Sequence, residues 1–177
     1  MKNMNQINQN SFRNCAFIIA SALLFFMSAN MQAQIAIGGG LGYNEKVSGA
    51  GVTAKAQFNI TNEIAISPGF TYFFGTAVYG FNQNMIAVDV NGHYFFDIMD
   101  DKLKIYPLVG LNFSSYKTGY SNYYFQTSEV SNSTFGANIG AGAQYKFTEK
   151  LSVYLEPKYV ASEFGQVIVN AGILYQL

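Results

Sequence analysis

The single histidine of the chain, His93, is the first candidate for chemistry. A hydrolytic site would pair this imidazole with a nucleophile or an acid within hydrogen-bond reach. In the stretch IAVDVNGHYFF (residues 86–96), Asp89 lies on the same strand face as His93, and the next residue on that face is Phe95. Four residues of extended strand span about 13 Å, too far for a hydrogen bond. We therefore predict that the chain is not an enzyme.

A period of two in hydrophobicity runs through most of the chain and predicts β-strands. The predicted strands have about the length of tilted membrane strands, roughly 9–11 residues. They cover residues 35–43, 52–60, 64–74, 85–96, 103–114, 134–147, 151–160 and 167–177. Pro68, Pro107 and Pro157 lie inside strands, where each removes a backbone donor, and bulges are the expected accommodation.

The connections between these strands alternate in length. Short polar connections cover residues 61–63, 97–102 and 148–150, and longer ones cover 44–51, 75–84, 115–133 and 161–166. Short and long connections therefore fall at opposite ends of an up-and-down sheet. This asymmetry is expected of outer-membrane barrels, with short periplasmic turns and long external loops. The fold class is predicted to be all-β, an eight-stranded antiparallel up-and-down transmembrane β-barrel.

The two faces of the strands differ in composition. One face has no charged, amide or aliphatic hydroxyl side chain. An arginine or lysine on a lipid-facing strand costs about 2–4 kcal/mol at the bilayer centre, so a face this clean predicts lipid contact. A soluble, calycin-like barrel would turn the same face inward. Its wetted face would then carry few charges and many glycines, which suits a soluble surface poorly.

Aromatic residues on the apolar face gather near the strand ends. Tyr43, Tyr72, Phe74, Phe113, Phe135 and Tyr159 are predicted at the external rim, and Phe58, Tyr94, Phe96, Tyr145, Phe147 and Tyr175 at the periplasmic rim. Two aromatic belts around an aliphatic band are typical of membrane interfaces.

The other face would line a lumen that eight strands leave just wide enough for side chains. We predict a packed polar network of Lys55, Asp89, His93, Lys104, Lys146, Glu156 and Lys158, with Tyr106 and Tyr154 as hydrogen-bonding filler. Counting back from the short connections places Lys55 opposite Gly69, Asp89 opposite Gly110, His93 opposite Tyr106, Glu156 opposite Gly142 and Lys158 opposite Gly140. We expect no cofactor or metal site.

The first 33 residues differ from the rest. Residues 15–27 form an apolar run that is short for a membrane span but suits a signal peptide, and cleavage is expected after Ala33. Cys15 opens this run rather than following it, which argues against a lipid anchor. Removal of residues 1–33 leaves a domain of residues 34–177 without cysteine, and so without disulfide or thiol chemistry. Only 11% of the residues are charged and the net charge is zero, so we expect no nucleic-acid partner.

Residues 34–177 resemble the small eight-stranded outer-membrane β-barrels of the OmpX, OmpA-transmembrane-domain and opacity-protein kind, most of all the Bacteroidetes type. The resemblance rests on the amphipathic strands, the loop alternation and the final NAGILYQL. It implies integral insertion in the outer membrane of a Gram-negative cell, with membrane lipids and lipopolysaccharide as partners. It also implies reading of the C-terminal strand by the insertion machinery. That strand usually ends in an aromatic residue, whereas here it ends in Leu177, two after Tyr175.

The connection 115–133 is the best candidate for an external binding loop, to an unknown surface ligand. It carries Tyr116, Tyr120, Tyr123, Tyr124 and Phe125 among small polar residues, a composition used in binding surfaces. The simpler interpretation is a strand hairpin that continues beyond the membrane. The expected function is a structural or surface-interaction role with a plugged lumen. The alternatives are a small porin-like channel and a lipid-A-modifying enzyme.

Overall fold

A computed structural model describes residues 34–75, 81–99, 102–120, 129–163 and 165–177. The chain divides into the units Met1–Gln32 and Ala33–Leu177, and the fold below is that of the second. The predicted signal peptide, residues 1–33, lies outside the described residues. Within them, no helix has the length and apolar character needed to cross a membrane.

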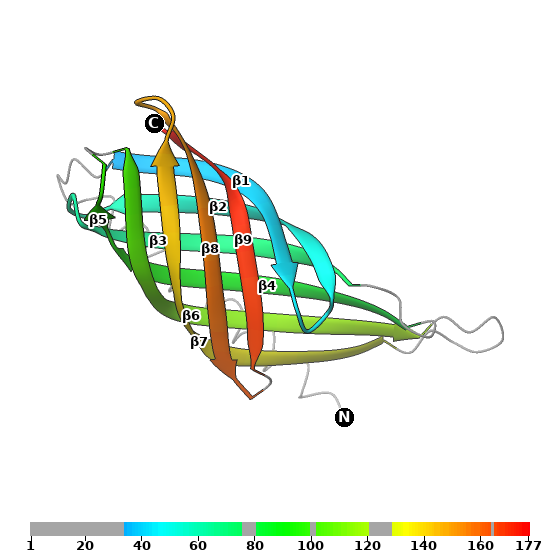
Figure 1. The fold of residues 1–177 in the computed structure, drawn as a ribbon. Coiled ribbons are helices and arrows are strands. Elements are labelled where there is room, and N and C mark those ends of the chain that lie inside the picture. The colour runs from blue at the N-terminus through cyan, green and yellow to red at the C-terminus, as the bar shows by residue number, and fades with distance from the viewer. Residues whose placement is uncertain (1–33, 76–80, 100–101, 121–128, 164) are drawn as a thin grey trace, which may run out of the picture. The chain divides into compact units, whose positions relative to one another are not determined.

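The unit is a closed antiparallel β-barrel (Figure 1). Its strands are β1 (Gln34–Asn44), β2 (Gly49–Asn59), β3 (Ile64–Phe74), β4 (Phe81–Tyr94), β5 (Phe96–Asp97), β6 (Leu103–Tyr120), β7 (Glu129–Lys146), β8 (Leu151–Ser162) and β9 (Gln166–Gln176). The two residues of β5 continue β4 after Phe95, and both pair with β6. The nine segments therefore make eight barrel strands. Pairing of β1 with β9 closes the ring, which confirms the predicted fold class.

The burial of the strands alternates and decides which face meets lipid. On the apolar face, Leu111 is 71% exposed and Phe135 is 78% exposed. On the other face, Asp89 and Lys158 are only 2% and 3% exposed. The apolar face therefore points outward and the polar face lines the interior, as a membrane barrel requires and opposite to a soluble barrel.

Exposed aromatic side chains occur at both ends of the outer face, as predicted. Tyr43, Phe74 and Tyr159 lie at the end with the long connections. Tyr94, Phe96, Tyr145, Phe147 and Tyr175 lie at the end with the short turns. The aliphatic band therefore runs between two aromatic belts that match the membrane interfaces.

Two glycines allow the close approach of β1 and β9. A Cβ atom on Gly40 would run into the backbone oxygen of Ala171, and one on Gly172 would run into the backbone oxygen of Gly39. No other residue fits at these positions without moving a strand. The tight curvature of a small barrel therefore depends on glycine where the ring closes.

Each of the three strand prolines interrupts the ladder on one side only. Pro68, Pro107 and Pro157 stay paired with Val90, Ala141 and Val169 on their other sides. At Pro68, the hydroxyl of Ser67 donates to the backbone oxygen of Ala56 at 2.9 Å, replacing the missing backbone donor. The prolines are therefore accommodated by local gaps in pairing.

The register was predicted correctly beside two short turns and wrongly beside the third. Lys55 pairs with Gly69 and Lys158 with Gly140, as predicted. Phe96, however, pairs with Ile105, because the strand runs on to a tight turn in which the amide of Lys102 donates to the oxygen of Met99. This shifts the β4–β6 register by two residues.

The shift changes two predicted partners without changing which face they are on. Asp89 pairs with Asn112 and His93 with Leu108, rather than with Gly110 and Tyr106. Asp89 does pair with a glycine on its other side, which is Gly69 of β3.

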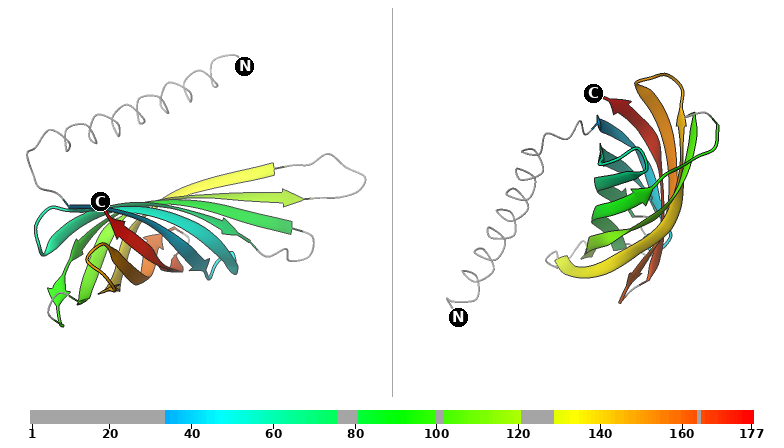
Figure 2. Two further views of the ribbon diagram at one scale, coloured as in Figure 1. Left: turned by 90° about the horizontal axis from the view of Figure 1, so that it is seen from above. Right: turned by 90° about the vertical axis from the view of Figure 1, so that its left-hand side faces the viewer.

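Strands β4, β6 and β7 run farther than their neighbours at the long-connection end (Figures 1 and 2). Pairing of β3 with β4 stops at Phe74–Asn84, and pairing of β7 with β8 begins at Gly136–Ser162. Beyond those points, residues 81–83, 115–120 and 129–135 form a three-stranded sheet, called here the sheet extension. Residues 115–120 and 129–133 of the connection 115–133 thus continue as strands beyond the barrel wall.

Candidate functional site

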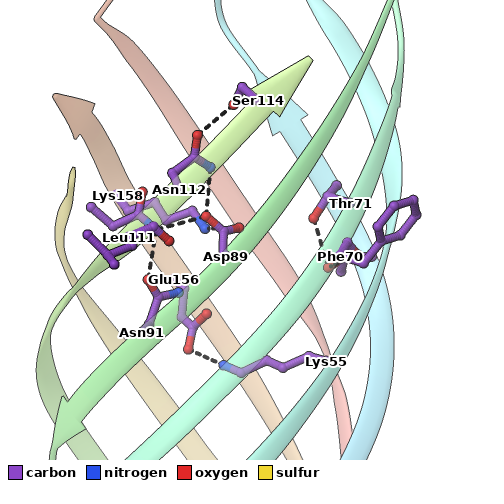
Figure 3. Close-up of polar contacts among 12 residues, drawn as sticks. Lys55, Phe70, Thr71, Asp89, Asn91, Leu111, Asn112, Ser114, Glu156 and Lys158 are labelled. Atoms are coloured by element: carbon purple, nitrogen blue, oxygen red, sulfur yellow. Dashed lines mark hydrogen bonds and ion pairs between the residues drawn. The ribbon is translucent and has the colours of Figure 1, made fainter. Parts of the chain in front are cut away.

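Two ion pairs cross the middle of the lumen (Figure 3). Lys55 of β2 pairs with Glu156 of β8, and Lys158 of β8 pairs with Asp89 of β4, with 2.6 Å between Nζ and Oδ2. All four side chains are at most 6% exposed. Because each charge has its opposite within reach, the buried group is electrically neutral as a whole.

Two asparagines contact Asp89, and a third contacts one of them. Asn112 and Asn138 donate to its Oδ1 at 2.8 and 2.7 Å, and Asn138 also donates to Asn91 Oδ1 at 2.7 Å. With Lys158 on Oδ2, the carboxylate accepts three hydrogen bonds. We call Lys55, Asp89, Asn91, Asn112, Asn138, Glu156 and Lys158 the polar belt. The asparagines were not among the predicted site residues, although their positions on the inward face were readable from the alternation.

Glu156 is held by three neighbours from different strands. It accepts from Lys55 and, at 2.7 Å, from the hydroxyl of Tyr106. The ring of His93 stacks on Tyr106 with 4.6 Å between centroids, and its Nε2 lies 3.6 Å from Glu156 Oε1. Tyr154 lies beneath Lys55, whose Nζ is 4.4 Å from the ring centroid. Tyr106 and Tyr154 thus fill the lumen around this ion pair.

The contacts of the His93 ring can be compared with those that a catalytic histidine needs. Neither ring nitrogen has a hydrogen-bond partner among the described residues. Its ring contacts are with Tyr106 and Phe95, and its side chain is fully buried. A catalytic histidine needs a nucleophile or orienting group within hydrogen-bond reach. The contacts that the described residues make with the His93 ring are aromatic packing against Tyr106 and Phe95, with Glu156 Oε1 at 3.6 Å from Nε2.

Lys104 and Lys146 do not join the belt, and their predicted place in the lumen network is wrong. Lys104 pairs with Asp97 at 3.3 Å near the short turns, where both side chains are partly exposed. Lys146 is exposed. Both residues stand at strand ends, so an inward-facing side chain there reaches solvent rather than the centre of the barrel.

Apolar side chains close the lumen on either side of the belt. Toward the long connections lies the long-end plug, which consists of Val47, Phe73, Met85, Ala87, Val160 and Ile168. Toward the short turns lie two separate clusters, called together the short-end plug, one of Ala65, Phe95, Tyr106 and Leu108 and the other of Ala36, Tyr154 and Leu174. Apolar clusters therefore lie toward both ends of the lumen from the ionic centre, among buried polar side chains such as Asn44 and Gln57.

Val47 reaches the long-end plug from the turn between β1 and β2. The Oδ1 of Asn44 accepts from the amides of Lys46 and Val47 at 2.8 and 3.2 Å, which folds the turn inward. The Nδ2 of Asn44 donates to Gln166 Oε1 of β9 at 2.8 Å. Sequence reasoning missed this plug because Val47 lies in a connection, outside any alternating run.

The predicted external binding loop is only partly described, and one of its residues belongs elsewhere. Tyr116 is wrong as an external contact, because its hydroxyl donates inward to Gln166 Oε1 at 2.8 Å and its ring packs on the long-end plug. Tyr120 ends β6. Tyr123, Tyr124 and Phe125 lie outside the described residues.

Within the described ranges, no group of three or more His, Cys, Asp or Glu side chains comes together.

The family described as outer membrane protein beta-barrel domain matches residues 17–173 of the chain. No curated protein sequence is significantly similar. The N-terminal β-barrel domain of Pseudomonas aeruginosa OprF is 18% identical, with a TM-score of 0.62 over 82% of this chain and 98% of that one. A major outer membrane protein of Thermus thermophilus is 12% identical, with a TM-score of 0.63 over 82% and 99%. Ail of Yersinia pestis is 17% identical, with a TM-score of 0.58 over 82% and 97%. At these identities the similarity concerns the fold.

Proposed function

We propose that this chain, which belongs to the outer membrane protein beta-barrel domain family, is a non-conducting outer-membrane barrel with a structural or surface-interaction role. The observation that carries the proposal is the closed lumen, in which a neutral polar belt lies between two apolar plugs. The sheet extension is the part that the barrel would present outside the cell.

Closure of the lumen argues against the porin-like alternative. Conduction needs a continuous water path, and here such a path would have to pass both plugs and the belt. An open path would also require the two buried ion pairs of the belt to move apart, which would leave their charges without partners inside the lumen. We rank a small porin-like channel second for this reason.

The sheet extension supplies an edge for a protein partner. Residues 129–135 of β7 pair with β6 on one side. On their other side, the pairing of β7 with β8 begins only at Gly136, so among the described residues this part of β7 is a strand edge. An exposed strand edge offers backbone donors and acceptors to an extended segment of another chain. The unknown surface ligand is therefore proposed to be an extended peptide segment.

A polyanion is a less suitable ligand at this end. Ail of Yersinia pestis has been crystallised with the heparin analogue sucrose octasulfate. In the present chain, the long connections carry Lys46 and Lys117 together with Glu45, Glu129 and Glu163. This balance gives no excess of positive charge to attract sulfate groups.

The proposal includes export by the signal peptide of residues 1–33 and insertion through the C-terminal strand. It also includes the absence of catalysis, since His93 is buried against Tyr106. His93→Ala should leave lipid A unchanged in mass spectra of the outer membrane. A loss of a lipid-A modification in that variant would favour the enzyme alternative.

A shortened hairpin tests the surface role. Residues 118–130 would be replaced by Asn-Gly, a two-residue turn that joins antiparallel strands, and Lys117→Gln would serve as the control that keeps both strands. In a strain lacking the gene, the native protein and the control should restore adhesion to cells or surfaces. The shortened variant should fold into a barrel with heat-modifiable gel mobility but should not restore adhesion. Equal adhesion with the shortened variant would contradict a role for the part of the sheet extension beyond the Lys117–Ser131 pair.

A further inference from the structure

A small cavity lies in the middle of the lumen, between the two ion pairs. Its volume is about 10 Å³, and its lining includes Lys55, Gly69, Asp89, Glu156, Lys158 and Asn170. We propose that this cavity is a binding site for a single ordered water molecule that links the two ion pairs. Lining residues come from β2, β3, β4, β8 and β9, so the site depends on closure of the barrel.

The size and charge of the cavity select a water molecule over an ion. Cavities that hold one water start at roughly 10–15 Å³, and the guest needs two to four polar partners. Two ammonium and two carboxylate groups line this cavity, so their charges cancel. A neutral guest that can both donate and accept fits this lining, whereas a cation or an anion would face a like charge.

Unused hydrogen-bonding capacity points to the same guest. Asn170 is 5% exposed, and its Oδ1 has no hydrogen-bond partner within the described part of the chain. An ammonium group has three donors, and each lysine of the belt uses one on its carboxylate. Water can accept from an ammonium and donate to an amide oxygen, which joins these groups.

Gly69 provides the space for the guest. It pairs with Lys55 on one side and with Asp89 on the other, so it sits between one member of each ion pair. A Cβ atom built on Gly69 meets nothing closer than the backbone oxygen of Ala54 at 3.7 Å. A methyl group at this position is therefore tolerated by the backbone and would project toward the cavity.

The plugs on either side of the belt would make exchange of this water slow. Phe73 and Met85 close one side, and Phe95 and Leu108 close the other, each at most 4% exposed. A water that is slow to exchange gives cross-peaks to nearby amide protons in nuclear magnetic resonance spectra. This provides a direct measurement on the folded barrel.

The test compares the native protein with Gly69→Ala and Gly92→Ala in lipid nanodiscs. Gly92 faces outward, and a Cβ there likewise meets nothing closer than 3.7 Å, which makes it a matched control. The native protein and Gly92→Ala should show water cross-peaks at belt amides, and Gly69→Ala should lose them while keeping heat-modifiable mobility on gels. Cross-peaks that persist in folded Gly69→Ala would overturn the proposal.

Two further measurements keep the proposal testable if Gly69→Ala does not fold. Asn170→Leu removes one proposed partner of the water and should also lose the cross-peaks. A crystal structure of the native barrel should show a density peak within hydrogen-bond distance of Asn170 or of a belt lysine. Absence of both the density and the cross-peaks in the native protein would contradict the water site.

Discussion

The buried pair Lys55–Glu156 and the partly exposed pair Lys104–Asp97 should differ greatly in their contribution to the stability of the barrel. Lys55→Met removes the partner of Glu156 in the centre of the lumen, where the two side chains are 6% and 3% exposed. Lys104→Met removes the partner of Asp97 at the short-turn end, where the side chains are 23% and 40% exposed. The second variant is therefore a control with the same chemical change.

The expected magnitude follows from what each change leaves behind. After Lys55→Met, Glu156 keeps the hydroxyl of Tyr106 but has lost its ammonium, and an uncompensated buried charge costs about 3–5 kcal/mol. Loss of a solvent-exposed pair costs about 0–1 kcal/mol. Lys55→Met should thus lower the free energy of unfolding by at least about 2 kcal/mol more than Lys104→Met.

A double-mutant cycle separates the ion pair from other effects of the substitutions. Glu156→Gln keeps an acceptor for Tyr106 but removes the charge, so the double variant Lys55→Met/Glu156→Gln has no unpaired charge. Its cost should be smaller than the sum of the single costs by about 1–3 kcal/mol, the coupling expected for directly interacting residues.

The assay is urea unfolding in phospholipid vesicles. The chain has no tryptophan, so unfolding would be followed by tyrosine fluorescence and by gel mobility without boiling. Equal costs for Lys55→Met and Lys104→Met, or additive costs in the cycle, would refute the view that the buried pair stabilises the closed lumen.

Three further changes give independent checks. Gly142→Ala places a methyl group against the ring of Tyr106 and should cost about 1–3 kcal/mol in the same assay; an unchanged midpoint would contradict the packing described here. Ser48→Gly relieves a backbone φ of 44° and should raise stability by about 1 kcal/mol, whereas a lower midpoint would count against strain at this turn. Asn44→Ala releases the turn that it holds and should speed trypsin cleavage after Lys46 in intact cells; an unchanged rate would mean that other contacts fix the turn.

Alternation along the chain was enough to predict the strands, their faces and part of the register. A strand with period two has one buried and one exposed face, so Lys55 and Lys158 could be placed in the lumen from spacing alone. Short turns of three residues set the pairing of Lys55 with Gly69 and of Lys158 with Gly140.

Contacts across the lumen could not be predicted in the same way. Lys55 and Glu156 are 101 residues apart and come from strands that are not neighbours in the sheet. Their meeting depends on the tilt and stagger of the closed barrel, which local spacing does not specify. Lys104 and Lys146, although predicted on the inward face, lie outside the polar belt because they stand at strand ends.

Turn geometry accounts for the other differences. The tight turn before Leu103 shifts the β4–β6 register by two residues, which brings Asn112 rather than Gly110 beside Asp89. The hydrogen bonds of Asn44 fold Val47 into the barrel. The first feature depends on a backbone hydrogen bond and the second on hydrogen bonds to the side chain of Asn44, and both form in turns, where hydrophobic alternation carries no information.

Single-channel recording of the purified barrel in planar bilayers tests the central claim most directly. The account predicts no stable conductance steps for the native protein, because the side chains of the long-end plug, the polar belt and the short-end plug fill the lumen. Stable steps that disappear when a bulky side chain is added at Gly69 would show that ions pass through the lumen, and would contradict the closed barrel.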